Sequence, residues 1–201
     1  MRFYVIGSCR VHGPLRGRPG YGKPVVGYTH TTKEAIQRVR HIRGEIVIAH
    51  SVAPYVFSRE RTPVVTAAHR RALNDADVML VEVCSAKEMQ YMGFWLNLNY
   101  AQNRELHAPV QEAAELERDL RALMRMVPRL VVVTHVDLPG IEDRARFSDR
   151  VRSACEKLDI PVFSPADHVG PDDMLDANHY KPDVVRQIGD RLMEFLCKPE
   201  T

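Results

Sequence analysis

Residues 3–9 of the chain read Phe-Tyr-Val-Ile-Gly-Ser-Cys, and this stretch decides the fold. Its first four residues are all apolar, which predicts a strand buried on both faces, because a strand with one wet face would alternate apolar and polar residues. Gly7 ends the strand and places Ser8 and Cys9 at its carboxyl end. In a parallel sheet this is the edge at which ligands bind.

Short apolar runs alternate with helical patterns along the rest of the chain. The expected strands are residues 3–6, 45–49, 78–83, 130–134 and 160–163, and the expected helices lie around residues 35–42, 65–73, 110–124, 151–158 and 184–195. This alternation predicts a parallel sheet with right-handed crossovers and helices on both faces. We therefore expect one α/β domain over residues 1–201, a flavodoxin-like three-layer α/β/α fold with a five-stranded parallel sheet.

Polar side chains follow several strands at the same edge of this sheet. They are His50 and Ser51 after the second strand, Cys84 and Ser85 after the third, and Asp176 and His179 after the fifth. The first and third strands are neighbours in a flavodoxin-like order, so we expect these residues to surround Ser8 and Cys9.

The segment Asp176-Ala177-Asn178-His179 spaces a carboxylate and an imidazole by three residues. In a single turn Asp176 can fix the orientation and tautomer of His179, which leaves the other ring nitrogen to take a proton from a thiol or hydroxyl. With Cys9 as nucleophile this gives the triad logic of acyl transfer, and Ser8 is the alternative nucleophile.

Three motifs together resemble the SGNH (GDSL-type) hydrolase superfamily. They are Gly7-Ser8-Cys9 at the start, Glu82-Val83-Cys84-Ser85 in the middle and the late Asp-x-x-His. In particular they resemble its Cys-bearing GSCFA-like branch, which includes proteins related to capsule biosynthesis. The resemblance spans nearly the whole chain and implies that Cys9 is the nucleophile, with Asp176 and His179 completing the triad.

The middle motifs of the superfamily are replaced in this chain. Neither the Gly expected after the second strand nor the Gly-x-Asn-Asp expected after the third is present. An oxyanion requires preorganised donors rather than one residue type, so other groups can take this role. The candidates for the oxyanion hole or the pocket wall are the Cys9 amide, Ser8, His12, His50, Ser51, Ser85, Asn97 and Asn99.

These patterns predict a Cys-dependent acyl-group transferase or hydrolase that acts on an ester or thioester through an acyl-enzyme. The expected partner is a small-molecule acyl substrate, with acyl-CoA or an acyl carrier as thioester donor and no required cofactor. The competing function is a non-enzymatic protein of the same fold that binds a ligand or partner. Residues 86–108 are dense in Met and aromatic side chains and form either a lid or pocket insertion or a part of the core.

Composition excludes several other classes. The net charge is +2, with 28 basic and 26 acidic residues, so no nucleic-acid or membrane partner is expected. The four cysteines form no CxxC pair, which indicates free thiols, and no bound metal is expected.

Residues 17–23 match GxxxxGK, but Pro24 stands where a phosphate loop needs a Ser or Thr hydroxyl, so a nucleotide hydrolase is excluded. The apolar start is too short for a signal peptide, and we expect a cytoplasmic protein.

Overall fold

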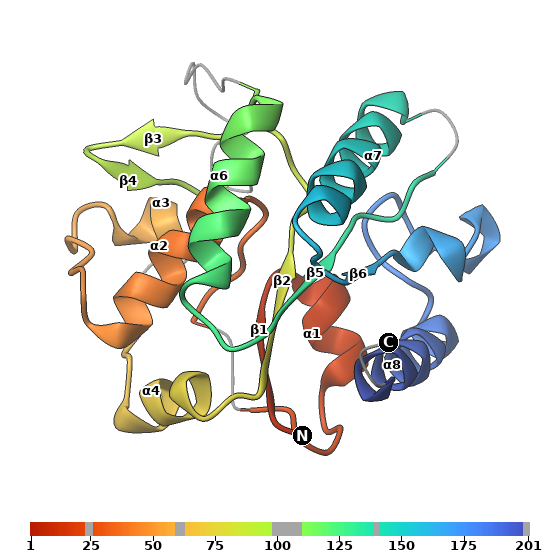
Figure 1. Cartoon of the computed structure of the whole chain (residues 1–201), viewed down its shortest axis with the longest axis horizontal. Coiled ribbons are helices and arrows are strands. Elements are labelled where there is room, and N and C mark those ends of the chain that lie inside the picture. Colours follow the sequence, from red (N-terminus) through yellow and green to blue (C-terminus); the bar gives the residue numbers. More distant parts are fainter. Residues whose placement is uncertain (23–25, 59–62, 98–109, 139–140, 199–201) are drawn as a thin grey trace.

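The sheet has four parallel strands in the order β1-β2-β5-β6 (Figure 1). The strands are β1 (Phe3–Ile6), β2 (Val78–Glu82), β5 (Leu130–Val133) and β6 (Val162–Phe163). The structure is a computed structural model that describes residues 1–22, 26–58, 63–97, 110–138 and 141–198. The α/β class and the pairing of the first expected strand with the third are confirmed.

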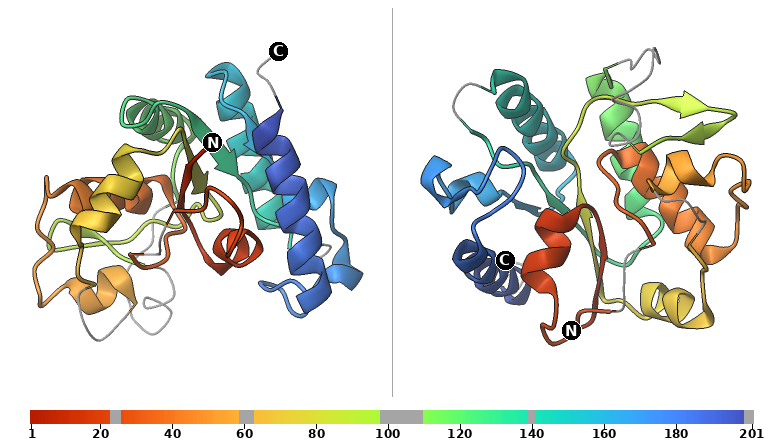
Figure 2. Two further views of the ribbon diagram at one scale, coloured as in Figure 1. Left: turned by 90° about the horizontal axis from the view of Figure 1, so that it is seen from below. Right: turned by 180° about the vertical axis from the view of Figure 1, so that it is seen from behind.

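Helices cover both faces of the sheet, and α1 lies beside α8 (Figures 1 and 2). One face packs against α1 (Cys9–Leu15) and α8 (Pro182–Cys197). The other packs against α2 (Thr32–Arg43), α4 (Ala67–Asn74), α6 (Ala113–Met124) and α7 (Glu142–Lys157). Shorter elements are α3 (Ala53–Phe57), two 3₁₀ turns at Pro165–Asp167 and Pro171–Asp173, and a hairpin of β3 (Gln90–Tyr91) and β4 (Phe94–Trp95).

Alternate residues of β1 enter two separate cores. Phe3 and Val5 pack with the α1 and α8 side, whereas Tyr4 and Ile6 pack with the α2, α4, α6 and α7 side. All four are buried, because helices cover the strand on both faces. This double burial explains why the run is continuously apolar.

The strand expected at residues 45–49 is wrong. These residues form a bend and an extended loop, in which Val47 is 83% exposed and only Ile48 enters the core. The outer edge of β1 is instead paired with the chain that follows α1. The Phe3 amide donates to the Gly20 carbonyl at 2.9 Å, and the Gly22 amide donates to the Phe3 carbonyl at 3.2 Å. The sheet therefore has four strands rather than five.

The segment expected as a lid or core, residues 86–108, is described only as far as residue 97. Within that part Met89 and Leu96 are buried in the core, while Tyr91 and Met92 are exposed at the tip of the β3–β4 hairpin. Residues 98–108 lie outside the described part of the chain. No helix among the described residues combines the length and the apolar character that crossing a membrane requires.

Candidate active site

Ser8 and Cys9 lie where β1 turns into α1, and the two side chains have different surroundings. Ser8 is the N-cap of α1: it is buried, and its Oγ accepts a hydrogen bond from the Arg10 amide at 3.3 Å. Cys9 is the first residue of the helix and is partly exposed. The hydroxyl therefore stabilises the turn, and the thiol is the more accessible of the two candidate nucleophiles.

A buried carboxylate at the end of β2 holds this turn in place. Glu82 is 1% exposed; its Oε2 accepts from the Ser8 amide at 2.5 Å and its Oε1 accepts from Arg10 Nε at 2.8 Å. Burial alone would raise the pKa of Glu82, but Arg10 and the hydrogen bonds from Ser8 bring it below its ordinary value. Glu82 and Arg10 therefore form a buried ion pair that fixes the backbone next to Cys9.

Asp176 and His179 form the expected pair on the loop before α8. His179 Nδ1 lies 2.9 and 2.8 Å from the two carboxylate oxygens of Asp176. The Asp176 carboxylate also accepts from the Asn178 amide at 2.7 Å, and these contacts lower its pKa. An ionised carboxylate only accepts, so Nδ1 carries the proton and Nε2 presents its lone pair. Both side chains are about half exposed, which keeps Nε2 accessible.

The chain next to His179 adjoins the Cys9 turn. Tyr180 is buried, and burial is the main reason its pKa is raised, with further contributions from Glu82 and Cys9. Helix α8, which follows this loop, packs against α1, the helix that Cys9 begins. The structure therefore brings the two ends of the sequence to the same edge of the sheet.

The other candidate residues have varied surroundings. Asn97 is fully buried and donates from Nδ2 to the Tyr28 carbonyl at 2.8 Å, and Ser85 Oγ accepts from the Lys87 amide at 3.0 Å. His12 is buried and shares a hydrogen bond of 2.6 Å with the Tyr21 hydroxyl; burial lowers its pKa to about 4. His50 and Ser51 are exposed in the turn before α3, and Asn99 lies outside the described residues.

The sequence did not predict roles at this edge for Arg10, Glu82, Arg144 and Tyr180. Arg144, at the start of α7, donates to the Ala177 carbonyl at 2.5 Å and to Asn178 Oδ1 at 2.9 Å. One signal was available for Glu82, since it is the single charged residue in the apolar run 78–83. The partners of Arg144 lie 33 and 34 residues further along the chain, and no local pattern indicates them.

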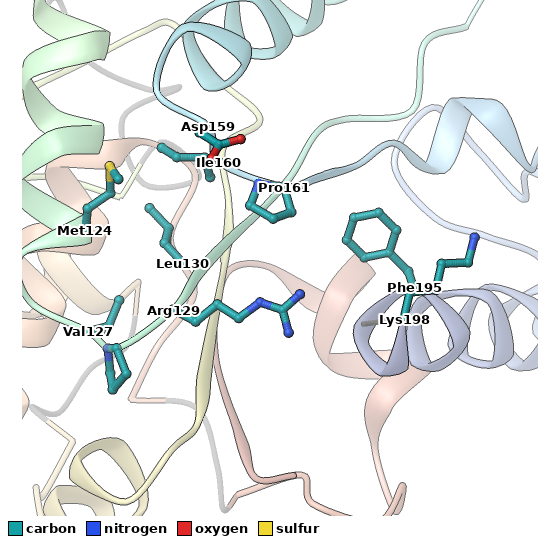
Figure 3. A pocket seen from close by; sticks show the side chains of 10 residues that line it. Met124, Val127, Arg129, Leu130, Asp159, Ile160, Pro161, Phe195 and Lys198 are labelled. Carbon is teal, nitrogen blue, oxygen red and sulfur yellow. The ribbon is translucent and has the colours of Figure 1, made fainter. Parts of the chain in front are cut away.

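A ligand-sized cavity lies away from this edge. A cavity of about 710 Å³ lies at the amino ends of β5 and β6, between the ends of α6 and α8, and Leu130, Ile160 and Phe195 are among its lining residues (Figure 3). The Cys9 turn lies at the opposite, carboxyl end of the strands. Among the described residues, no group of three or more His, Cys, Asp or Glu is arranged to hold a metal ion.

Comparison with known proteins gives matches over residues 1–195. The chain is 36% identical over 102 residues to the Vi polysaccharide biosynthesis protein TviD of Salmonella typhi, a match that covers 48% of this chain and 12% of that protein. Similar solved structures include an aryl esterase of M. smegmatis (12% identity, TM-score 0.48, 97% of each chain) and the acetylxylan esterase Axe2 of Geobacillus stearothermophilus (11% identity, TM-score 0.47, 98% of this chain and 94% of that one). The family model described as the TviD N-terminal domain matches residues 1–106 and 102–195. The chain therefore belongs to the TviD N-terminal domain family.

Proposed function

We propose that the chain is an acyl-group transferase or hydrolase in which Cys9 is the nucleophile, His179 the general base and Asp176 the residue that orients His179. The observation that carries this proposal is the Asp176–His179 pair, which fixes the imidazole with Nε2 free, directly before Tyr180, whose pKa is affected by Cys9. A thiol, an imidazole and a carboxylate are the groups that acyl transfer through a covalent intermediate requires.

In this mechanism His179 Nε2 takes the proton of the Cys9 thiol as Sγ attacks the carbonyl carbon of an ester or thioester. The bond between that carbon and its leaving oxygen or sulfur then breaks, and His179 returns the proton to the leaving group. Water or an acceptor hydroxyl next attacks the Cys9 thioester and releases the free thiol. Water gives hydrolysis, and a second substrate gives transfer.

Two donors that follow the neighbouring strands β1 and β2 support stabilisation of the oxyanion. The Cys9 amide belongs to the first turn of α1, where helix geometry provides no intrahelical acceptor. The Ser85 hydroxyl accepts from the Lys87 amide, so its own proton can be donated elsewhere. Such donors stabilise charge that develops in the transition state.

The relative named for Vi polysaccharide biosynthesis supports a substrate from polysaccharide biosynthesis. We propose an acyl-CoA or acyl-carrier thioester as the donor, because a thiol nucleophile exchanges readily with a thioester. A cytoplasmic location, where such donors occur, belongs to the same proposal.

A non-enzymatic binding protein is the alternative, and one observation favours it. The amides of Cys84 and Ser85, which follow β2 at the site, both donate to the His30 carbonyl, at 2.9 and 3.1 Å. Neither amide is therefore available to an oxyanion, which reduces the donors at this edge.

The deciding experiment is intact-mass spectrometry after incubation with a panel of acyl thioesters. Cys9→Ala should lose the acyl adduct and lower turnover by about three orders of magnitude or more, whereas Ser8→Ala should keep the adduct. Cys197→Ala is the matched control, since Cys197 is an exposed thiol on α8 that would report non-specific acylation. Labelling lost only in Cys197→Ala would favour the binding protein, and activity lost only in Ser8→Ala would assign the chemistry to Ser8.

A further inference from the structure

The loop that carries Asp176 and His179 has few contacts that could hold it. Residues 175–179 are all exposed. Within the loop, the His179 carbonyl accepts from the amides of Leu175 at 2.8 Å and Asp176 at 3.5 Å, and Met174 forms an isolated bridge with Tyr180. These bonds close the loop on itself, and the buried Met174 and Tyr180 anchor its two ends in the core, but none of these contacts holds the exposed tip.

One side chain from another element, α7, forms hydrogen bonds with the tip of this loop. Arg144, in the first turn of α7, donates through Nη1 to the Ala177 carbonyl and through Nη2 to Asn178 Oδ1. The two acceptor oxygens belong to the two residues that lie between Asp176 and His179 in the sequence. A planar guanidinium with two donors fixes both the distance and the orientation of what it holds.

The surroundings of Arg144 differ from those of a surface ion pair. Both of its acceptors are neutral oxygens, and no carboxylate in the described part of the chain lies within ion-pair distance of it. Burial and the nearby Arg10 charge both lower its pKa, so its position is electrostatically unfavourable. Arg146, two residues along the same helix, instead pairs with Glu142 at 3.2 Å and is exposed.

We propose that Arg144 is a positioning residue that, by holding Ala177 and Asn178, keeps the His179 imidazole aligned for proton transfer with Cys9. The inference rests on the proposed acyl-transfer function. Arg144 does not touch the reacting atoms: it acts through the loop backbone, so its removal leaves all three catalytic side chains in place but loosens the Asp176–His179 contact and the alignment of His179 with Cys9.

The effect on turnover tests this role. Arg144→Ala should lower kcat by about 10- to 100-fold with little change in KM. This is the range typical of residues that orient a functional side chain without contacting the substrate. Arg144→Lys keeps a cation but only a point-like donor and should recover part of the loss. Arg146→Ala on the same helix should match the parent protein.

A spectroscopic measurement separates positioning from folding and does not require a known substrate. Side-chain ¹H–¹⁵N NMR of His179 should show one tautomer, protonated at Nδ1, in the parent and in Arg146→Ala, and a mixture of tautomers in Arg144→Ala. Asn178→Ala removes one of the two contacts and should give an intermediate result. If Arg144→Ala does not fold, the His179 tautomers of Asn178→Ala and Arg144→Lys test the positioning role instead.

The failures are distinguishable. Unchanged kcat and an unchanged tautomer in Arg144→Ala would overturn the positioning role while leaving the proposed function in place. Full activity in His179→Ala would overturn the proposed function itself, whatever Arg144→Ala does.

Discussion

At the scale of single residues, the buried carboxylate of Glu82 determines what can stand beside the nucleophile. A Cβ added at Gly7 would lie 2.7 Å from the Cβ of Glu82, closer than carbon atoms pack. Gly7 is therefore required by a close approach between β1 and β2, the same approach that lets Glu82 reach the Ser8 amide. The glycine that ends the strand and the acid that ends its neighbour act together.

Gly7→Ala should consequently lower the free energy of unfolding by about 1–3 kcal/mol, because overpacking forces the strands apart, and should slow acylation of Cys9. Urea unfolding and labelling rates measure the two effects. Gly13→Ala is the control: it lies in α1, its added Cβ meets only Val185 at 3.9 Å, and it should leave stability unchanged or raise it. Equal stability of the two variants would contradict the close-approach argument.

At the scale of elements, a buried polar cluster joins α2 to α6. Lys33 Nζ lies 2.9 Å from Glu88, 3.2 Å from Glu115 and 3.5 Å from Asp119. Burial would lower the pKa of Lys33, but these carboxylates raise it, so the amine is charged. The side chain is only 10% exposed, and the interactions are therefore weakly screened by solvent.

Lys33→Met should destabilise the protein by about 3–5 kcal/mol, because it leaves buried carboxylates without their cation. Lys157→Met removes a pair of similar length, 2.7 Å to Glu117, but with the lysine 61% exposed. That control should cost less than about 1 kcal/mol. Thermal and urea unfolding of both variants make the comparison, and a loss in Lys33→Met no larger than in the control would refute it.

The helices and strands differ in how well the sequence predicts them. Apolar spacing predicts α2, α4, α6 and α8 correctly, but it starts α7 at residue 151 instead of Glu142 and predicts neither α1 nor α3. Residues 45–49 are apolar enough to predict a strand. They do not pair with the sheet, because the outer edge of β1 hydrogen-bonds to Gly20 and Gly22 instead. Such competition between segments is non-local, as are the partners of Glu82 and Arg144. The Asp176–His179 contact was predictable because three residues suffice to close it.

At the scale of the whole molecule, two histidines are buried in their neutral form beneath the site. His12 lies in α1 with a pKa lowered to about 4, and His135 follows β5 with a pKa lowered to about 3; burial is the main cause for both. His135 Nδ1 donates to the Val136 carbonyl at 2.8 Å. In the unfolded chain both rings would titrate near 6.5, so protons bind the unfolded state more tightly.

Stability should therefore be complete above about pH 6.5 and fall as the pH drops towards 4, by about 4 kcal/mol for both rings between pH 7 and 5. Glu88, whose pKa is raised by burial, acts in the opposite sense and reduces the net change. Urea unfolding at the two pH values measures it. The double variant His12→Gln/His135→Gln should lose most of this pH dependence, whereas His168→Gln, at an exposed position, should retain it. A double variant as acid-sensitive as the parent protein would place the titrating groups elsewhere.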